Sequence, residues 1–136
     1  MTDLNALFPR LSAEEARLLS PLQLAYVGDS VHALMVRARL IEKKLKVRDM
    51  HLASNRAVSA VSQARAAQAI LPLLTVEEAA ILRRGRNAHP HHAAPKSAST
   101  GEYAGATALE ALLGYLFLTG QTERLIELLP YLQGEE

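Results

Sequence analysis

Apolar side chains recur every three or four residues along most of this 136-residue chain, and no stretch alternates apolar and polar positions for more than a few residues. Spacings of three and four place side chains on one face of a helix, whereas a half-buried strand alternates with a period of two. The pattern therefore predicts an all-α fold, with one domain over residues 1–136 built from about six to seven helices.

Three of the predicted helices begin with a capping box, in which a Ser or Thr N-cap precedes Glu or Gln by three residues. The pairs are Ser12 with Glu15, Ser20 with Gln23, and Thr75 with Glu78. The first box follows an irregular lead over residues 1–11 and opens a short helix that ends near Leu19. The third box opens a helix to about Arg83, which Gly85 is expected to stop.

Three further helices are expected from the apolar pattern, with weaker signals at their ends. Their expected limits are 48–71, with a break near Ser54-Asn55; Thr100, as N-cap, to about Thr119; and Thr122, as N-cap, to Leu132, before a tail over 133–136. Pro72 ends the first of these, because proline cannot continue a helix.

The helix that Ser20 opens is the most informative segment of the chain. Pro21 is favourable at its first position, and the helix is expected to run to about Leu40. One face of it carries Leu22, Ala25, Asp29, Ala33, Val36 and Leu40. An unpartnered buried carboxylate costs several kcal/mol, so Asp29 on this apolar face needs a cation or a donor. The neighbouring Gly28, unfavourable inside a helix, would let another backbone approach closely.

A second apolar helix, over residues 106–118, also carries one acid. Glu110 has Gly114 one turn later and Ala106 one turn earlier on the same face. Two acids of this kind on two helices suggest one shared site, and a hard divalent cation such as Mg²⁺ between them would explain both. The alternative is that each acid pairs with an arginine or caps a loop, and the pattern alone does not decide between the two.

Composition narrows the classes of function that remain. Apolar residues make up 49% of the chain, which excludes a disordered protein, and the absence of cysteine excludes disulfides and thiolate metal sites. Asp29 and Glu110 interrupt the two most apolar stretches, so we expect no membrane span. We therefore expect a cytoplasmic protein. With a net charge of only +1, an argument for nucleic-acid binding must rest on where the charges lie.

The strongest local concentration of charge is a long basic loop over residues 84–99, together with Arg83, which directly precedes it. Its candidate RNA-binding side chains are Arg83, Arg84, Arg86, Asn87 and Lys96. Arginine forks match phosphate oxygens, and a glycine among them lets a backbone come close. The alternative is a solvated loop, or cations at a helix C-terminus. The length and charge of the loop favour nucleic acid.

Other candidate residues are weaker. A histidine cluster in this loop fits no regular zinc spacing, so a metal site is the less favoured interpretation of His89, His91 and His92. His32, three residues after Asp29, could be a base, but packing on the helix surface is favoured. Tyr26 and Tyr115 are expected in the core. Arg37 and Arg39 lie later on the helix that carries Asp29 and are either structural or phosphate-facing. Lys43, Lys44 and Lys46 belong to a charged turn after that helix.

Three motifs in order resemble the ribonuclease III family. Residues 24–31 (LAYVGDSV) resemble its signature helix, residues 108–114 (ALEALLG) resemble its second acidic helix, and residues 83–88 (RRGRNA) lie between them. The length of the chain, with no double-stranded-RNA-binding domain, resembles the short form called Mini-ribonuclease III. The resemblance covers residues 22–132 and implies an all-helical, ribonuclease III-like catalytic domain.

The resemblance also implies a homodimeric, magnesium-dependent endoribonuclease that cuts double-stranded RNA and acts on precursor 23S ribosomal RNA. By motif position, Asp29 and Glu110 become the catalytic and metal-binding carboxylates. Small neighbours such as Gly28 and Gly114 would then leave room for RNA. The arginine loop would grip phosphates beside the acids.

The chain departs from the longer enzymes of the family at three positions. Leu22, Ala25 and Thr107 stand where those enzymes carry further acids, which leaves open whether one or two metal ions bind. These departures support an alternative, a non-catalytic helical module that binds RNA or the ribosome. That module would bind RNA without magnesium-dependent cleavage.

Overall fold

The computed structural model describes residues 4–88 and 99–134, and these residues form helices and connecting turns without a strand. The α-helices are α1 (Ala13–Arg17), α2 (Pro21–Leu40), α3 (Val47–Ala57), α4 (Ala60–Ile70), α5 (Val76–Arg86), α6 (Thr100–Leu118) and α7 (Thr122–Leu128). Short 3₁₀ turns are Leu4–Leu7, Ile41–Lys43, Leu71–Leu73 and Leu129–Tyr131. The all-α prediction is confirmed for the described residues.

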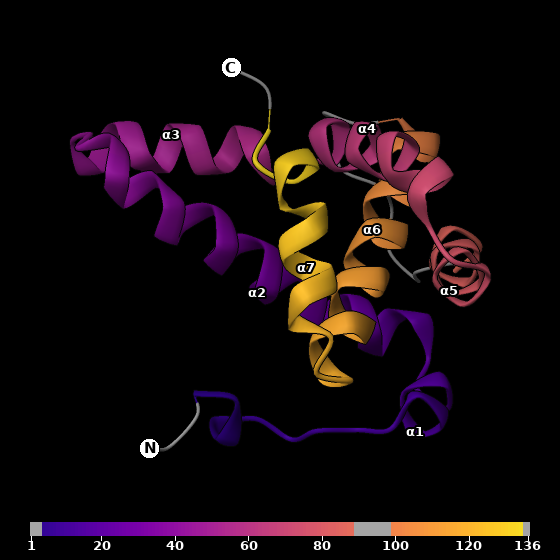
Figure 1. The fold of residues 1–136 in the computed structure, drawn as a ribbon. Coiled ribbons are helices and arrows are strands. Elements are labelled where there is room, and N and C mark those ends of the chain that lie inside the picture. Colours follow the sequence, from indigo (N-terminus) through magenta and orange to yellow (C-terminus); the bar gives the residue numbers. More distant parts are fainter. Residues whose placement is uncertain (1–3, 89–98, 135–136) are drawn as a thin grey trace.

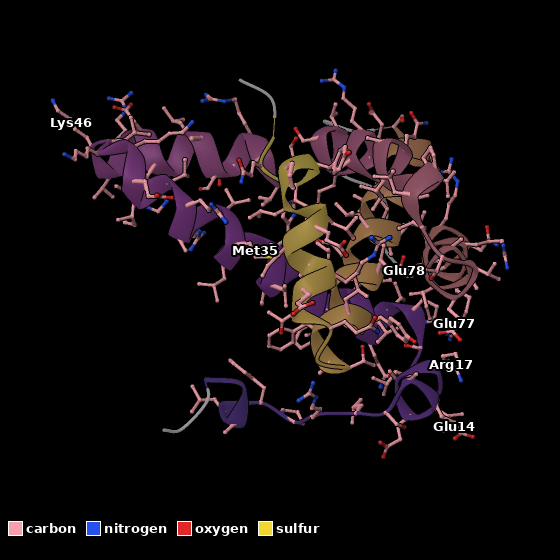
Figure 2. All side chains as sticks on the ribbon, viewed as in Figure 1. Glu14, Arg17, Met35, Lys46, Glu77 and Glu78 are labelled. Atoms are coloured by element: carbon pink, nitrogen blue, oxygen red, sulfur yellow. The ribbon has the colours of Figure 1, made fainter. Side chains whose placement is uncertain are left out.

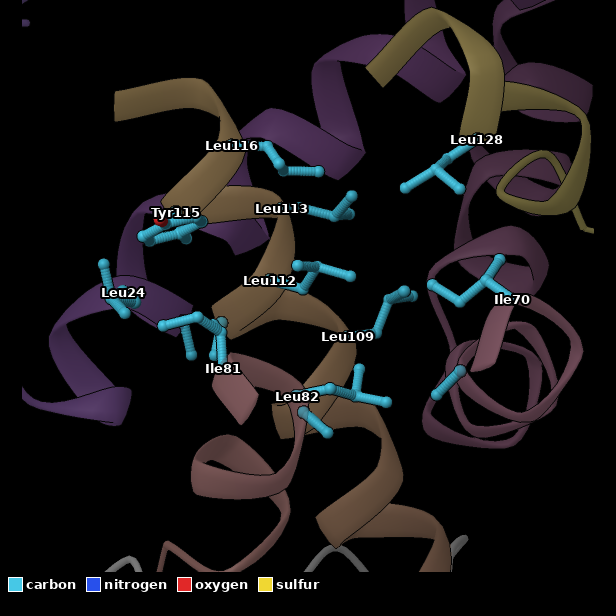
Figure 3. Packing of buried hydrophobic residues seen from close by; sticks show 14 of the residues in the cluster. Leu24, Ile70, Ile81, Leu82, Leu109, Leu112, Leu113, Tyr115, Leu116 and Leu128 are labelled. Carbon is cyan, nitrogen blue, oxygen red and sulfur yellow. The ribbon is translucent and has the colours of Figure 1, made fainter. Parts of the chain in front are cut away.

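Helix α6 lies at the centre of the molecule, packed between α2, α4 and α5, with α7 crossing it (Figure 1). Four of its five leucines are fully buried and point in several directions into the core (Figure 3). They are Leu109, Leu112, Leu113 and Leu116. Burial of one such side chain contributes about 1.5–3 kcal/mol. A helix that is apolar on all sides is therefore stable here because other helices surround it.

Glycines set how closely the other helices approach α6. A Cβ added to Gly28 of α2 would collide with the carbonyl oxygen of Glu110 and lie 2.9 Å from the amide nitrogen of Gly114. A Cβ on Gly85 of α5 would lie 2.8 Å from the Cα of Ala108. The expected close approach of another backbone at Gly28 is confirmed. The expectation that Gly28 and Gly114 leave room for RNA is wrong, because neighbouring helices fill that space.

The three capping boxes form as expected. The side-chain oxygens of Ser12, Ser20 and Thr75 each accept a hydrogen bond from the backbone amide three residues later. In return, the backbone amide of each of these N-caps donates to the side chain of that later residue. A fourth box begins α6, where the N-cap is Ser99 rather than the expected Thr100. The N-cap of α7 is Gln121 rather than Thr122.

Several helix ends differ from the expectation. The break in the expected 48–71 helix falls at Val58 and Ser59, because Ser59 caps α4 through the amide of Ser62. Helix α5 continues through Gly85 to Arg86, since Gly85 is held helical by its packing on α6, so the basic loop does not begin at residue 84. Helix α7 stops at Leu128, and the chain continues as a 3₁₀ turn that contains Pro130.

The lead before α1 is more ordered than expected. It contains the 3₁₀ turn Leu4–Leu7, and the ring of Phe8 meets that of Phe117 edge-on at 5.0 Å between centroids. The amide of Leu11 donates to the carbonyl of Leu118 at 2.8 Å. The lead is thus fixed to the end of α6. Among the described residues, none of the helices has both the length and the apolar character needed to cross a membrane.

Candidate active site

The two acids proposed from sequence come together where α2 crosses α6. Asp29 lies on α2 directly after Gly28. Glu110 lies on α6, and its backbone carbonyl oxygen packs against Gly28. Their carboxyl groups are close enough for a hydrogen bond and a strong mutual repulsion. The two acids singled out from the sequence thus lie at the same place, because the glycine contact brings α2 and α6 together there.

The burial of the two acids is unequal, and the predicted face of α2 is correct only in part: Ala25, Val36 and Leu40 are buried as expected, but the face does not hold at Leu22 and Asp29. Asp29 is exposed, and Leu22 on the same predicted face is 39% exposed, whereas Leu24, Gly28 and His32 are buried. Gly28 must face α6, and successive residues turn by about 100° around a helix, so Asp29 lies at the edge of the contact. Asp29 is therefore open to solvent, whereas Glu110 is partly buried.

A buried chain of hydrogen bonds stands behind Glu110. The Nε2 of Gln63 on α4 donates to Oε2 of Glu110 at 3.3 Å and lies 2.9 Å from Nδ1 of His32. The Nε2 of His32 lies 2.6 Å from the carbonyl oxygen of Leu132. A carbonyl only accepts, so His32 donates from Nε2 and accepts from Gln63 at Nδ1.

His32 is therefore part of the interior, and its expected place on the helix surface is wrong. It is 1% exposed, and burial lowers the pKa of His32 although the Leu132 carbonyl and the charge of Asp29 favour its protonated form. Gln63 was not identified from the sequence. It lies in a segment rich in Ala and Gln, and only the packing of α4 on α6 distinguishes it from its neighbours.

The electrostatics at Glu110 favour a cation. Burial, the charge of Asp29 and the hydrogen bond with Asp29 raise the pKa of Glu110 to about 8, against a smaller opposing effect of Gln63. Paired carboxylates are the oxygen ligands that hard divalent cations prefer, and a bound cation would remove their repulsion. In the described part of the chain, no group of three or more His, Cys, Asp or Glu side chains that could hold a metal ion is found.

This raised pKa predicts an unusual pH dependence of stability. Without divalent cations, we expect the free energy of unfolding to fall as the pH rises from about 6.5 to 8. The pKa of Glu110 is about 8 when folded and near its ordinary 4.5 when unfolded, so between these values the folded chain holds a proton that the unfolded chain has lost. Each pH unit in this range then lowers the free energy of unfolding by at most about 1.4 kcal/mol. The stabilisation by protonated Glu110 is complete below pH 4.5 and is lost as the pH rises through about 8.

Urea unfolding followed by circular dichroism in a chelator measures this slope. The window begins at pH 6.5 because the lowered pKa of His32 has the opposite effect below that value. Glu110→Gln should flatten the slope, and added Mg²⁺ should reduce it. An unchanged slope in Glu110→Gln would contradict the assignment of the titration to Glu110.

The basic residues predicted to bind RNA divide into three groups. Arg84 is half-buried and donates to the carbonyls of Arg17 at 3.3 Å and Leu19 at 3.0 Å, so it fastens α5 to the end of α1. The side chains Arg83, Arg86 and Asn87 are exposed at the end of α5. Lys96 and the cluster of His89, His91 and His92 lie outside the described residues.

Of these side chains, Arg86 reaches α6, the helix that carries Glu110. Its Nη1 lies 3.9 Å from the position of a Cβ on Gly105. Gly105 precedes Glu110 by five residues on α6, or about 8 Å along the helix axis. The end of α5 therefore packs against α6 about one and a half turns before Glu110.

An apolar hollow of about 750 Å³ adjoins Asp29. Its lining comes mainly from α2 and α7, with Phe8 and Phe117 at one end. Tyr26 is 82% exposed here, so its expected place in the core is wrong, whereas Tyr115 is buried as expected. Leu34 and Ile126 are 66% and 60% exposed. So many large apolar side chains on one face indicate an interaction surface.

Comparisons with known proteins agree on one family. The Ribonuclease III domain matches residues 22–121. A Mini-ribonuclease 3 of Symbiobacterium thermophilum is 49% identical over 112 residues, which covers 82% of this chain and 85% of that protein. A Mini-ribonuclease 3 of Brevibacillus brevis is 44% identical over 115 residues, covering 84% and 85%. A crystal structure of a Fusobacterium nucleatum protein superposes with a TM-score of 0.77 at 27% identity, covering 84% of this chain and 91% of that one.

Proposed function

The chain belongs to the ribonuclease III family as an endoribonuclease of the Mini-ribonuclease III type, and we propose that it hydrolyses double-stranded RNA in a magnesium-dependent reaction. The observation that carries this proposal is the meeting of the Asp29 and Glu110 carboxylates where α2 crosses α6. The raised pKa of Glu110 supports the proposal, because two carboxylates that repel each other are suited to binding a divalent cation.

We propose Asp29 and Glu110 as both the catalytic and the metal-binding residues. A magnesium ion held by them would supply an activated water and charge stabilisation at the leaving oxygen. Asp29 is exposed and so meets the RNA backbone directly. Glu110 is held from behind by Gln63, whose amide keeps one carboxylate oxygen in place. Because Glu110 must be ionised to bind a cation, binding should release a proton near neutral pH.

The proposed substrate contacts follow from shape and charge. Double-stranded RNA is recognised through phosphates and 2′-hydroxyl groups rather than by base stacking. We assign phosphate contacts to Arg83, Arg86 and Asn87 at the exposed end of α5, together with Lys96. Arg84 supports them by holding α5 in place. Precursor 23S ribosomal RNA is the proposed natural substrate, and this role requires a cytoplasmic location.

We propose that the apolar hollow beside Asp29 is covered by a second copy of the chain. The exposed Tyr26, Leu34 and Ile126 give this face the apolar character of a stable protein interface. Asp29 lies on its rim, so a twofold dimer formed here brings the two acidic pairs near the same interface. One pair could then act on each strand of a duplex.

A dimer formed through this face should dissociate when a charge is placed in it. We expect Leu34→Glu to convert the protein to a monomer, because an isolated carboxylate would be buried against apolar side chains. Light scattering after size-exclusion chromatography measures the mass directly. Val76→Glu is the matched control, since Val76 is equally apolar and 88% exposed but lies on α5. If Leu34→Glu keeps the mass of a dimer, another face forms the interface.

The test of the proposed activity is cleavage of a long double-stranded RNA with and without Mg²⁺. Single-stranded RNA and double-stranded DNA of the same sequence are the controls. We expect cleavage of duplex RNA only, lost in chelator and restored by Mg²⁺. Salt-sensitive binding without any cleavage would instead support the alternative of a non-catalytic module that binds RNA or the ribosome.

A further inference from the structure

The positive charge of the chain is concentrated in residues 37–56, here called the basic arm. These residues contain seven of the fifteen Lys and Arg side chains and two of the fourteen Asp and Glu side chains, which gives a local net charge of +5. The remainder carries eight basic and twelve acidic side chains, or −4. The modest net charge of +1 therefore hides two regions of opposite sign.

The basic arm is a structured projection. The end of α2 and the start of α3 meet away from α5, at the left of Figure 1, and Lys46 lies at the tip in Figure 2. Its own small core packs Val36, Leu40 and Ala57 together, apart from the main core. At the turn, Lys44 takes a left-handed conformation with φ 55°, which folds the chain back sharply. The charges are thus displayed on a fixed support.

All seven cations of the basic arm are exposed to solvent: Arg37, Arg39, Lys43, Lys44, Lys46, Arg48 and Arg56. Within the described residues, no hydrogen bond or ion pair holds any of these side chains. Arg124 is different, because Glu78 and Glu127 neutralise it. The seven cations are therefore available to bind a polyanion.

The position of the basic arm relative to the acids is set by α2 itself. Asp29 and Arg37 are eight residues apart on one continuous helix, which places them about 12 Å apart along its axis. The tip lies farther along the same direction (Figure 2). Any phosphate bound by the arm is therefore held at a fixed offset from the acidic pair.

We propose that the basic arm binds the phosphate backbone of the duplex RNA at a distance from the cleavage site. This inference rests on the proposed function and extends it, since nothing in the acidic site or at the end of α5 requires it. Contacts of this kind supply affinity that does not depend on sequence. They position a duplex against Asp29 in a chain whose remaining surface is net negative.

The test replaces cations at and near the tip and measures binding separately from cleavage. Lys43→Gln, Lys46→Gln and Arg48→Gln are combined in one variant, which leaves the small core of the arm intact. Fluorescence anisotropy with a labelled RNA duplex in chelator gives affinity at several salt concentrations. We expect at least a tenfold loss of affinity at low salt. The slope of log Kd plotted against log salt concentration should also decrease by about 2–3.

Controls separate the basic arm from a general effect of charge. Arg17→Gln removes one exposed cation at the opposite side of the molecule (Figure 2) and is compared with Lys46→Gln alone. Only Lys46→Gln should weaken binding and lower the salt dependence. The cleavage rate of the triple variant should be reduced at low RNA concentration and should recover as the RNA concentration is raised, because the arm is proposed to act through binding and the acidic pair is untouched.

The outcomes distinguish the basic arm from the proposed function. Unchanged affinity and salt dependence in the triple variant would overturn the arm proposal while leaving cleavage by Asp29 and Glu110 in place. Weakened duplex binding by a protein that never cleaves would support the arm and contradict the proposed activity. If the triple variant loses binding to anionic phospholipid vesicles but not to RNA, the arm binds membranes and the proposal is wrong.

Discussion

Glu110→Gln should abolish cleavage of double-stranded RNA and at the same time stabilise the protein in the absence of metal. The loss of activity follows from removing one of two carboxylates that would hold the cation, and we expect a decrease in kcat of roughly a thousandfold or more. The gain in stability follows from the raised pKa of Glu110, because a neutral amide does not repel Asp29. An unfolded or damaged variant cannot produce this combination.

Asp29→Asn should give the same loss of cleavage with a different effect on stability. Asp29 is exposed and is only one of the causes of the raised pKa of Glu110, so the gain in stability should be smaller than that of Glu110→Gln. The substitution also removes the charge that helps to raise the pKa of Glu110, so the pH dependence of stability should become weaker. Both variants should still bind duplex RNA, since the cationic side chains are unchanged.

The measurements are single-turnover cleavage with Mg²⁺ and thermal unfolding in chelator at pH 8. Glu77→Gln is a suitable control because Glu77 is an exposed acid on a different helix, α5, and this variant should cleave at the unmodified rate. Cleavage at the unmodified rate by either Asp29→Asn or Glu110→Gln would remove that residue from the proposed metal site. A loss of stability in Glu110→Gln at pH 8 would contradict the electrostatic account of the pair.

The pairing of the acids could be predicted from sequence because it depends on local features of two helices. A glycine beside an acid in an apolar helix indicates a close backbone contact, and the same feature occurs at Glu110 and Gly114. Helix starts were predictable for a similar reason, since a capping box is complete within four residues. The boxes at Ser12, Ser20 and Thr75 all form.

The rest of the site depends on contacts between distant segments. Which side of α2 is buried depends on where Gly28 meets α6, so Asp29 is at the edge of the contact and not on the buried face. The link from Gln63 to His32 and Leu132 joins three elements far apart in the sequence. Gly85 does not end α5, because its packing against Ala108 outweighs the usual helix-stopping tendency of glycine.

Gly28→Ala should be among the most destabilising single methyl additions in this protein. An alanine at an ordinary helix position is more favourable than glycine by about 1 kcal/mol. At Gly28, however, the new Cβ would collide with the backbone carbonyl of Glu110, which cannot move aside as a flexible side chain can. The helices α2 and α6 must separate, and we expect a loss of more than about 3 kcal/mol.

The matched control for this variant is Gly101→Ala, on α6 itself. The nearest atom to a Cβ at Gly101 is the Oγ of Ser99 at 4.0 Å, so the methyl group meets no obstacle. Gly101→Ala should therefore raise the free energy of unfolding by about 0.5–1 kcal/mol. Thermal unfolding should show a decrease of roughly 10 °C or more for Gly28→Ala and a small increase for Gly101→Ala.

The same pair of variants connects the helix crossing to the activity. Separation of α2 from α6 moves Asp29 away from Glu110, so any folded Gly28→Ala protein should need more Mg²⁺ for half-maximal cleavage. It should also lose much of the pH dependence of stability, because the repulsion that raises the pKa of Glu110 weakens with distance. If Gly28→Ala is as stable as the unmodified protein and needs no more Mg²⁺, the crossing is not what holds the two acids together.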